Sequence, residues 1–275
     1  MVFAALGLGV VIGLVIGALG GGGSVLTVPV LVFALGLGAQ EATTASLVIV
    51  GITAAVAALG HARSGHTRWR TGLTIAAAGV PASVLGSYLN RSIEENALLL
   101  AFAALMLVAA AGMLVRTDPD DEPPDPTPTT APGAGSAGTT TAVRQPQQHT
   151  QRLVWLRLAG AGLLIGFLTG FFGVGGGFVI VPVLVVALGF SMPAAVGTSL
   201  LVIALNSGVA LAARSLQGGF AWDVIVPFTA AAVAGSLLGK QVADRLPSAI
   251  LTRAFAVLLV LVAAYVAVRA VQGLT

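Results

Sequence analysis

Hydrophobic residues run along this chain in long stretches that contain no Asp, Glu, Lys or Arg. These stretches cover residues 1–40, 42–62, 71–90, 96–115, 158–213, 224–239 and 254–268. A helix that crosses the roughly 30 Å hydrocarbon core of a bilayer needs about 20 such residues. The stretches are rich in Leu and Ala and do not alternate polar with apolar positions, which excludes a membrane β-barrel. The pattern therefore predicts an all-α polytopic membrane protein.

The composition supports the same prediction. Of the 275 residues, 57% are hydrophobic and only 8% are charged, whereas about a quarter of the residues in a soluble domain are charged. The mean hydropathy is +0.99, and one aqueous core cannot hide that much apolar surface. The expected surroundings of the chain are therefore a lipid bilayer.

Two parts of the chain repeat one sequence pattern. Residues 27–36 read TVPVLVFALG and residues 180–189 read IVPVLVVALG, with their prolines 153 residues apart (182 − 29). The same offset aligns further positions: Gly13 with Gly166, Gly17 with Gly170, Ser46 with Ser199, Trp69 with Trp222, and Gly86 with Gly239. Apolar segments match by chance at Ala and Leu, but a shared register of Gly, Pro, Ser and Trp indicates an internal duplication.

The segment between the two copies has a different composition. Residues 117–151 contain seven prolines, an acidic cluster at residues 118–125, and many Thr and Gly. Such a segment cannot bury a core, so we expect a disordered linker. The predicted organisation is a first transmembrane repeat over residues 1–116, a linker over 117–151 and a second transmembrane repeat over 152–275.

Each repeat is predicted to contain a glycine-broken apolar segment followed by three ordinary spans. The broken segments are residues 2–38, interrupted at 20–23, and residues 158–189, interrupted at 173–177. The spans are expected at about residues 42–60, 71–89 and 97–115, and at about 194–213, 224–242 and 250–267. Two short arms fit a helical hairpin that enters and leaves by the same side. Each repeat then crosses the membrane three times, so the second repeat is expected to be inverted relative to the first.

The distribution of basic residues tests this layout, because cytoplasmic loops collect Lys and Arg. The inverted arrangement places ten of the 13 Lys and Arg residues on the cytoplasmic side, including those in the loop 61–70. A parallel arrangement places nine there. The charges favour inversion by one residue. They stand singly at the ends of apolar stretches, so the net charge of +3 does not indicate a nucleic-acid partner.

The glycine breaks are the candidate binding site. Irregular backbone at membrane depth is tolerated only where protein buries it or where it lines a wet cavity, and inverted-repeat transporters bring two interrupted helices together near the midplane. A helix that restarts after a break offers unpaired N–H groups, which suit a small oxyanion. The predicted binding residues are Gly21, Gly22, Gly23, Ser24, Pro29 and Ser46, together with Gly175, Gly176, Gly177, Pro182, Ser199 and Asn206.

Other glycines are expected to pack helices, a role that glycine commonly has in membranes. We assign it to Gly9, Gly13 and Gly17 and to their counterparts at 162, 166 and 170, which recur every four residues. If packing also explained the breaks, the chain would be a membrane scaffold or assembly factor. That alternative to a transporter stays open.

No pattern of catalytic or metal-binding residues stands out. The three histidines, His61, His66 and His149, are expected in loops and lack a His–Glu metal spacing. A G-x-S-x-G motif is absent, and Gly239–Lys240 lacks the rest of a P-loop. The absence of Cys excludes disulfides and thiolate chemistry. We therefore predict no catalytic residues, no metal and no cofactor, which argues against an enzyme.

These motifs resemble a known family. Two halves that each carry G-x-x-x-G, a GGG-type break and a V-P-V-L segment resemble the sulfite exporter TauE/SafE family, also called the sulfonate uptake permease family. The resemblance covers residues 2–115 and 158–273. It is strongest in the second copy, GFFGVGGGFVIVPVLVVALGFSMPAAVGTS, and weaker in the first, GALGGGGSVLTVPVL.

The resemblance implies a multi-pass permease of the bacterial inner membrane for sulfite, sulfonates or related small organic anions. It also implies a transport pathway along the glycine–proline segments, at Gly22, Gly23, Pro29, Gly175, Gly176 and Pro182. The substrate, the direction of transport, the coupling ion and the oligomeric state, for which a homodimer is one option, stay open.

Overall fold

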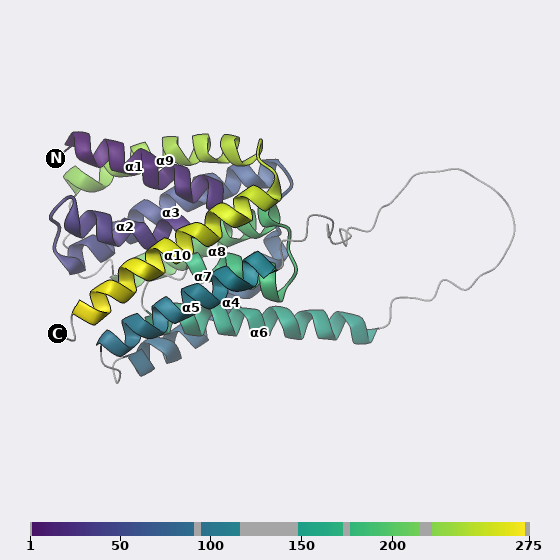
Figure 1. Ribbon diagram of the computed structural model, residues 1–275. Coiled ribbons are helices and arrows are strands. Elements are labelled where there is room, and N and C mark those ends of the chain that lie inside the picture. Colours follow the sequence, from purple (N-terminus) through teal and green to yellow (C-terminus); the bar gives the residue numbers. More distant parts are fainter. Residues whose placement is uncertain (1, 91–94, 116–147, 173–176, 215–221, 273–275) are drawn as a thin grey trace, which may run out of the picture.

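Every regular element in the described part of the chain is helical. The computed structural model describes residues 2–90, 95–115, 148–172, 177–214 and 222–272 (Figure 1). The first half comprises α1 (Val2–Leu19), α2 (Gly22–Phe33), α3 (Ala39–Arg63), α4 (Trp69–Asn90) and α5 (Glu95–Val115). The second half comprises α6 (Gln148–Phe172), α7 (Gly177–Pro182), the π-helical turn η1 (Val183–Ala187), α8 (Met192–Arg214), α9 (Trp222–Ala243) and α10 (Ser248–Gln272). The all-α prediction is confirmed, and most of the predicted linker, residues 117–147, lies outside the described residues.

Five of the described helices are long and apolar enough to cross a membrane. These candidate spans are Glu41–Arg63, Ala97–Val115, Met192–Ala212, Trp222–Ala243 and Ser248–Val268. Helix α4, which carries Arg70 and several Thr and Ser residues, was expected to be a sixth but is not among them. Shorter apolar helices flank the glycine breaks, as the sequence predicts: Ala5–Leu19 and Gly22–Phe33, and Leu156–Phe172 and Gly177–Ala187.

The outer surface of the bundle is apolar. Large hydrophobic side chains on most of the long helices are exposed, among them Val11, Phe33, Val84, Val108, Leu156, Val226 and Leu261. An aqueous surface of this kind would be unusual, whereas lipid tails solvate it without cost. The exposed faces therefore fit a protein that is embedded in a bilayer.

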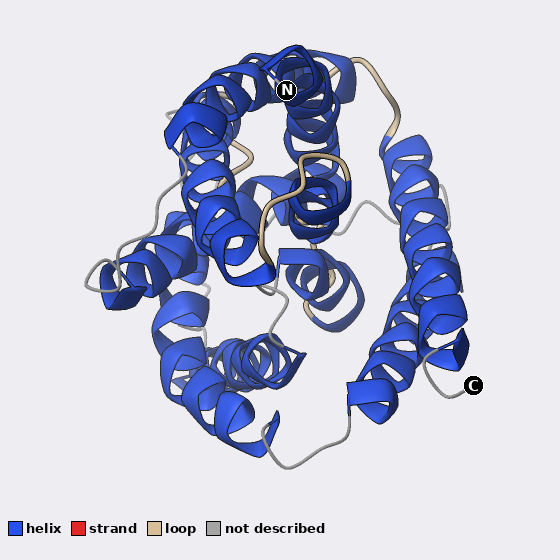
Figure 2. Ribbon diagram, turned by 90° about the vertical axis from the view of Figure 1, so that its left-hand side faces the viewer, coloured by secondary structure: helices blue, strands red, loops and turns tan. Residues whose placement is uncertain are grey.

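Helices α3 and α8 form the centre of the bundle. The candidate spans on these two helices are each 61% buried, compared with 28% for the span on α5. Around them, α1 packs along α9, α6 packs along α4, and α5 packs along α10. Figure 2 views this bundle from the end that carries the N-terminus, with most helices seen close to end-on.

Glycines allow two of these helix pairs to approach closely. A Cβ atom on Gly13 of α1 would overlap the backbone of Ala232 on α9, and a Cβ atom on Gly166 of α6 would overlap the backbone of Gly79 on α4. Gly9, Gly17, Gly162 and Gly170 meet the same partner helices in the same way. The packing role predicted for these six glycines is confirmed.

The contacts also give the relative directions of the helices. Gly13 and Gly17 lie against Ala232 and Ser236 in turn, so α1 and α9 run parallel, and the glycines of α6 show the same for α4. In contrast, His61 lies against Gly197 while Gly51 lies against Ser207, so α3 and α8 run antiparallel. Helix α1 begins and α10 ends at the same end of the bundle (Figure 1).

Candidate functional site

The helices that follow the two breaks, α2 and α7, begin next to one another inside the bundle. Helix α1 ends at Leu19, and the chain turns through Gly20, whose φ of +69° is the left-handed conformation that favours glycine. Helix α2 then starts beside α7, which follows the second break. A side chain on Gly21 would overlap the carbonyl oxygen of Gly177, so the two backbones touch. Both restarted helices therefore begin at one place in the protein interior.

Hydroxyl groups near the breaks donate to their own backbone. The hydrogen bonds run from Ser24 Oγ to the Gly21 carbonyl (2.7 Å), from Ser46 Oγ to the Thr43 carbonyl (2.8 Å), and from Ser199 Oγ to the Val196 carbonyl (2.8 Å). Serine in membrane helices commonly bonds in this way. Each oxygen keeps its acceptor lone pairs, and the O–H can rotate to donate to a ligand instead.

A cavity of about 970 Å³ opens beside the first break, and we call it the main cavity. Helices α2, α3, α4, α5, α6, α8 and α10 all contribute to its walls. Its size lies within the usual range of small-molecule sites, which is about 300–1,000 Å³. The walls are mainly apolar, and Phe102, Phe172 and Tyr265 supply aromatic surface.

Besides the Tyr265 hydroxyl on α10, neutral polar groups on five other helices line the main cavity. They are Ser24 on α2, Thr43 and Ser46 on α3, Ser83 on α4, Thr169 on α6, and Asn206 and Ser207 on α8. Among the described residues that line the cavity there is no Asp, Glu, Lys, Arg or His. The described ranges also contain no group of three His, Cys, Asp or Glu side chains that could hold a metal ion. This arrangement can bind a ligand through hydrogen bonds and apolar contact, without a fixed countercharge.

Four of the predicted binding residues line the main cavity. Ser24 and Pro29 face it from α2, Ser46 from α3 and Asn206 from α8. The structure therefore brings the first helix break together with a helix from the other half of the chain. Asn206 contributes both a carbonyl acceptor and an amide donor.

Two of the predicted glycines face neighbouring helices and not the cavity. A Cβ atom on Gly22 would lie 3.1 Å from the ring of Phe255 on α10. A Cβ atom on Gly23 would collide with Ile16 on α1. Both glycines are buried, so at these positions glycine allows α2 to pack against its neighbours.

The remaining predicted residues lie apart from the main cavity or outside the described residues. Pro182 is buried within α7. Ser199 is fully buried, and its hydroxyl lies beside Gly20 at the first break. Gly175 and Gly176 fall outside the described ranges.

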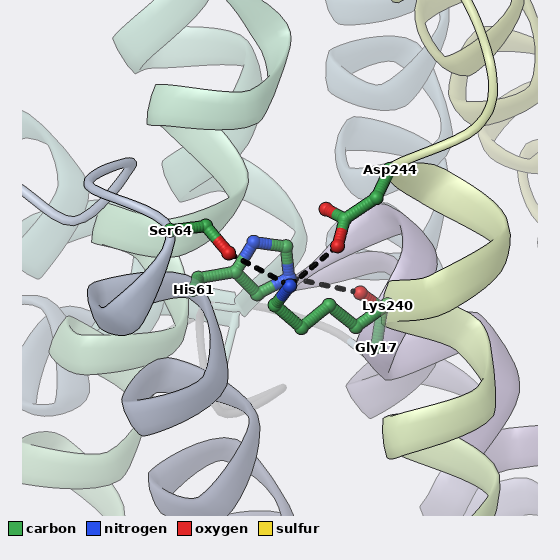
Figure 3. Close-up of polar contacts among 5 residues, drawn as sticks. All are labelled: Gly17, His61, Ser64, Lys240 and Asp244. Atoms are coloured by element: carbon green, nitrogen blue, oxygen red, sulfur yellow. Dashed lines mark hydrogen bonds and ion pairs between the residues drawn. The ribbon is translucent and has the colours of Figure 1, made fainter.

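Sequence reasoning missed a polar cluster at the end of the bundle where α3 and α9 end (Figure 3). The prediction that His61 lies in a loop is wrong, because α3 continues past this residue, which is buried with 2% of its surface exposed. Its Nε2 lies 3.1 Å from the carbonyl oxygen of Gly17, in the last turn of α1. His66 does lie in the turn after α3, whereas His149 falls in the first turn of α6.

A cavity of about 230 Å³ lies within this cluster, and we call it the His61 pocket. Its polar lining consists of His61, Ser64, His66 and Asp244. Lys240 of α9 donates to Ser64 Oγ at 2.9 Å and forms an ion pair with Asp244 (Figure 3). The signal available in the sequence was the Lys240–Asp244 pair at i,i+4 spacing where a span ends. The histidine that joins it is 179 residues away (240 − 61).

Comparison with known proteins supports the family resemblance seen in the sequence, over nearly the whole chain. The family model of the sulfite exporter TauE/SafE family matches residues 5–266. A probable membrane transporter protein of Xylella fastidiosa (strain Temecula1) is 30% identical over 264 residues, which cover 95% of this chain and 93% of the relative. The probable membrane transporter protein YunE of Bacillus subtilis (strain 168) is 23% identical over 280 residues, covering 92% and 94%. No solved structure matches the chain significantly.

Proposed function

The chain belongs to the sulfite exporter TauE/SafE family, and we propose that it is a secondary transporter of small sulfur-containing or organic anions, such as sulfite or sulfonates. It is a multi-pass membrane protein, and the relatives described above are named as probable membrane transporters. The family description supplies sulfite as the first candidate substrate. The bacterial inner membrane is the proposed location, with the loop 61–70 on the cytoplasmic side.

The main cavity is the observation that carries this proposal. It adjoins the first turn of α2 inside the bundle, and its polar groups are hydroxyls and one amide. Such groups can replace water around an anion by donating hydrogen bonds. The described lining residues carry no fixed positive charge, which also favours release, because transport requires a ligand that binds weakly enough to leave. The surrounding apolar walls suit the carbon part of an organic sulfonate.

We further propose that the two repeats are inverted relative to one another. Under the 153-residue offset, α1 corresponds to α6 and α9 corresponds to α4. The two glycine-lined contacts, α1 with α9 and α6 with α4, are therefore the same contact in each repeat, and we call them the glycine seams. Helices α3 and α8 also correspond, and their antiparallel contact is the arrangement that inversion requires.

The proposed mechanism is alternating access around the two breaks. The glycine seams hold α1 to α9 and α6 to α4, so each seam can move as one body. Movement of these bodies about the contact between Gly21 and Gly177 would open the main cavity to one side of the membrane and then to the other. This contact lies where both restarted helices begin.

The test is anion flux in proteoliposomes that contain the purified chain. Labelled sulfite, sulfate and methanesulfonate are offered to the native protein and to the Asn206→Leu variant, which removes the amide from the main cavity at similar volume. A hydrogen bond to a charged group contributes about 1.5–3 kcal/mol, so flux at low substrate concentration should fall about 10- to 100-fold. Thr74→Val is the matched control, because Thr74 is a polar residue of α4 that does not line the cavity.

The outcomes separate the alternatives. Anion flux that falls in Asn206→Leu and persists in Thr74→Val supports both the transporter and its site. Flux that is unchanged in a well-folded Asn206→Leu variant keeps the transporter and removes this residue from the pathway. A native protein that carries none of the tested anions would favour the scaffold alternative.

A further inference from the structure

The His61 side chain lines the His61 pocket and carries a buried basic nitrogen that has no hydrogen-bond partner in the described part of the chain. A carbonyl oxygen only accepts hydrogen bonds, so the contact with Gly17 requires His61 to carry its proton on Nε2. Nδ1 of the neutral ring is then a bare acceptor. Within the described part of the chain, this buried atom has no hydrogen-bond partner. A buried acceptor of this kind is costly unless a proton, a ligand or water satisfies it.

The electrostatic surroundings of this nitrogen are nearly balanced. Lys240 in the last turn of α9 and Asp244 directly after that helix form an ion pair and cancel one another. The turn after α3 contributes His66, whose buried Nδ1 also lacks a partner among the described residues. The pocket residues from α1, α8 and α10 carry no titratable group. With both imidazoles neutral the pocket therefore has no net charge, and protonation of His61 makes it positive.

The pocket also has room for a ligand. A water molecule occupies about 30 Å³ in the liquid, so a cavity of about 230 Å³ holds a small oxyanion with a few waters. The pocket lies next to the first helix break, because Gly17 belongs to the last turn of α1 and Ala18 lines the pocket. Carbonyls in the last turn of a helix lack an intrahelical donor, and His61 supplies one to Gly17.

We propose that the His61 pocket is a second anion site, in which His61 takes up a proton on Nδ1 and the imidazolium then binds a small oxyanion such as a sulfonate. One proton from water bonds to the Nδ1 lone pair, and Nε2–H keeps its hydrogen bond to Gly17. The proton returns to water when the anion leaves. This inference rests on the proposed function, since it places a proton-dependent anion site at the end of the same bundle.

The test measures anion binding separately from transport. Methanesulfonate is the probe, because its charge stays constant between about pH 5.5 and about pH 8, where histidine normally titrates. Binding is read from the stabilisation of the purified full-length chain against heat, which increases with ligand concentration over Kd. The variant is His61→Gln, whose amide can still donate to Gly17 but cannot be protonated. Thr74→Val, at a position of α4 that does not line the pocket, is the control.

The native protein is expected to bind methanesulfonate about tenfold more tightly at about pH 5.5 than at about pH 8, the order of one charge-assisted hydrogen bond. His61→Gln should lose this pH dependence, and Thr74→Val should keep it. Equal pH dependence in the native protein and in His61→Gln would overturn the proposal, as would pH-independent binding by the native protein. Proteoliposome flux on the same samples keeps the two proposals apart. Flux without pH-dependent binding rejects only this site, whereas pH-dependent binding without flux rejects only transport.

Discussion

A single methyl group at Gly13 is expected to disrupt the contact between α1 and α9. In the native structure the backbone of Ala232 occupies the space that a Cβ atom would need. The overlapping atoms are main-chain atoms of a helix, so no side-chain rotation can relieve the clash. Carbon atoms pack at about 3.5–4.0 Å, so α1 must move away from α9 by about 1 Å or more. The movement loosens the seam on both sides of Gly13.

The size of the effect follows from two opposing contributions. Overpacking of this kind costs about 1–3 kcal/mol, and rigid backbone on the opposing side places Gly13→Ala near the upper end. In the opposite direction, alanine stabilises a helix by about 1 kcal/mol relative to glycine. Gly7→Ala receives the same gain without a clash, because nothing lies within 4 Å of its Cβ position. The difference between the two variants is therefore expected to be about 3 kcal/mol.

The assay is thermal unfolding of the two purified variants in the same detergent. A change of 1 kcal/mol shifts Tm by about 2–4 °C in a chain of this size class, so Gly13→Ala should melt about 6–12 °C below Gly7→Ala. Gly166→Ala, which meets the backbone of Gly79 on α4, should behave like Gly13→Ala. If Gly13→Ala and Gly7→Ala melted within about 1 °C of each other, the close approach of α1 and α9 would be refuted.

Three further predictions concern stability. Phe102 is buried and packs edge-on against Phe178 with ring centroids 4.9 Å apart, so Phe102→Ala should destabilise the protein by about 3–5 kcal/mol and lower its Tm. Thr53 is fully buried, and within the described residues its hydroxyl has no partner, so Thr53→Val should raise Tm by relieving about 1–3 kcal/mol of desolvation cost. Thr27→Val is the opposite case, because it removes a 3.2 Å hydrogen bond to the Gly23 carbonyl, and its Tm should fall by the equivalent of about 1 kcal/mol. A Thr53→Val variant that melts below the native protein would show that this hydroxyl is satisfied.

Local sequence patterns predicted the positions of the long helices and of the first interruption correctly. The charge-free stretches placed the long helices to within a few residues; α3, for example, runs from Ala39 to Arg63 where a span over 42–60 was expected. The first break fell where the glycines begin, between Leu19 and Gly22. These features depend on whether a segment can lie in lipid and on whether its backbone can continue as a helix. Both are properties of the segment itself.

The candidate site was predicted only in part, because a glycine has no side chain that indicates what it faces. Ser24 and Asn206 do line the main cavity, and their polar groups in apolar stretches were the signal. Gly22 and Gly23 have the same local pattern as Gly21, yet they pack against Phe255 and Ile16. Those partners lie on other helices, and no spacing within the break identifies them.

The sequence by itself determined that this chain lies in a membrane, because lipid is the only solvent for its apolar stretches and a helix is the way in which they satisfy their backbone. It also determined where the helices break. Only the tertiary structure decided that Gly21 touches Gly177 where α2 and α7 begin, that α3 and α8 lie at the centre, and that His61 joins Lys240 and Asp244 around one pocket. These contacts join residues far apart in the chain, and they form only when whole helices pack against one another.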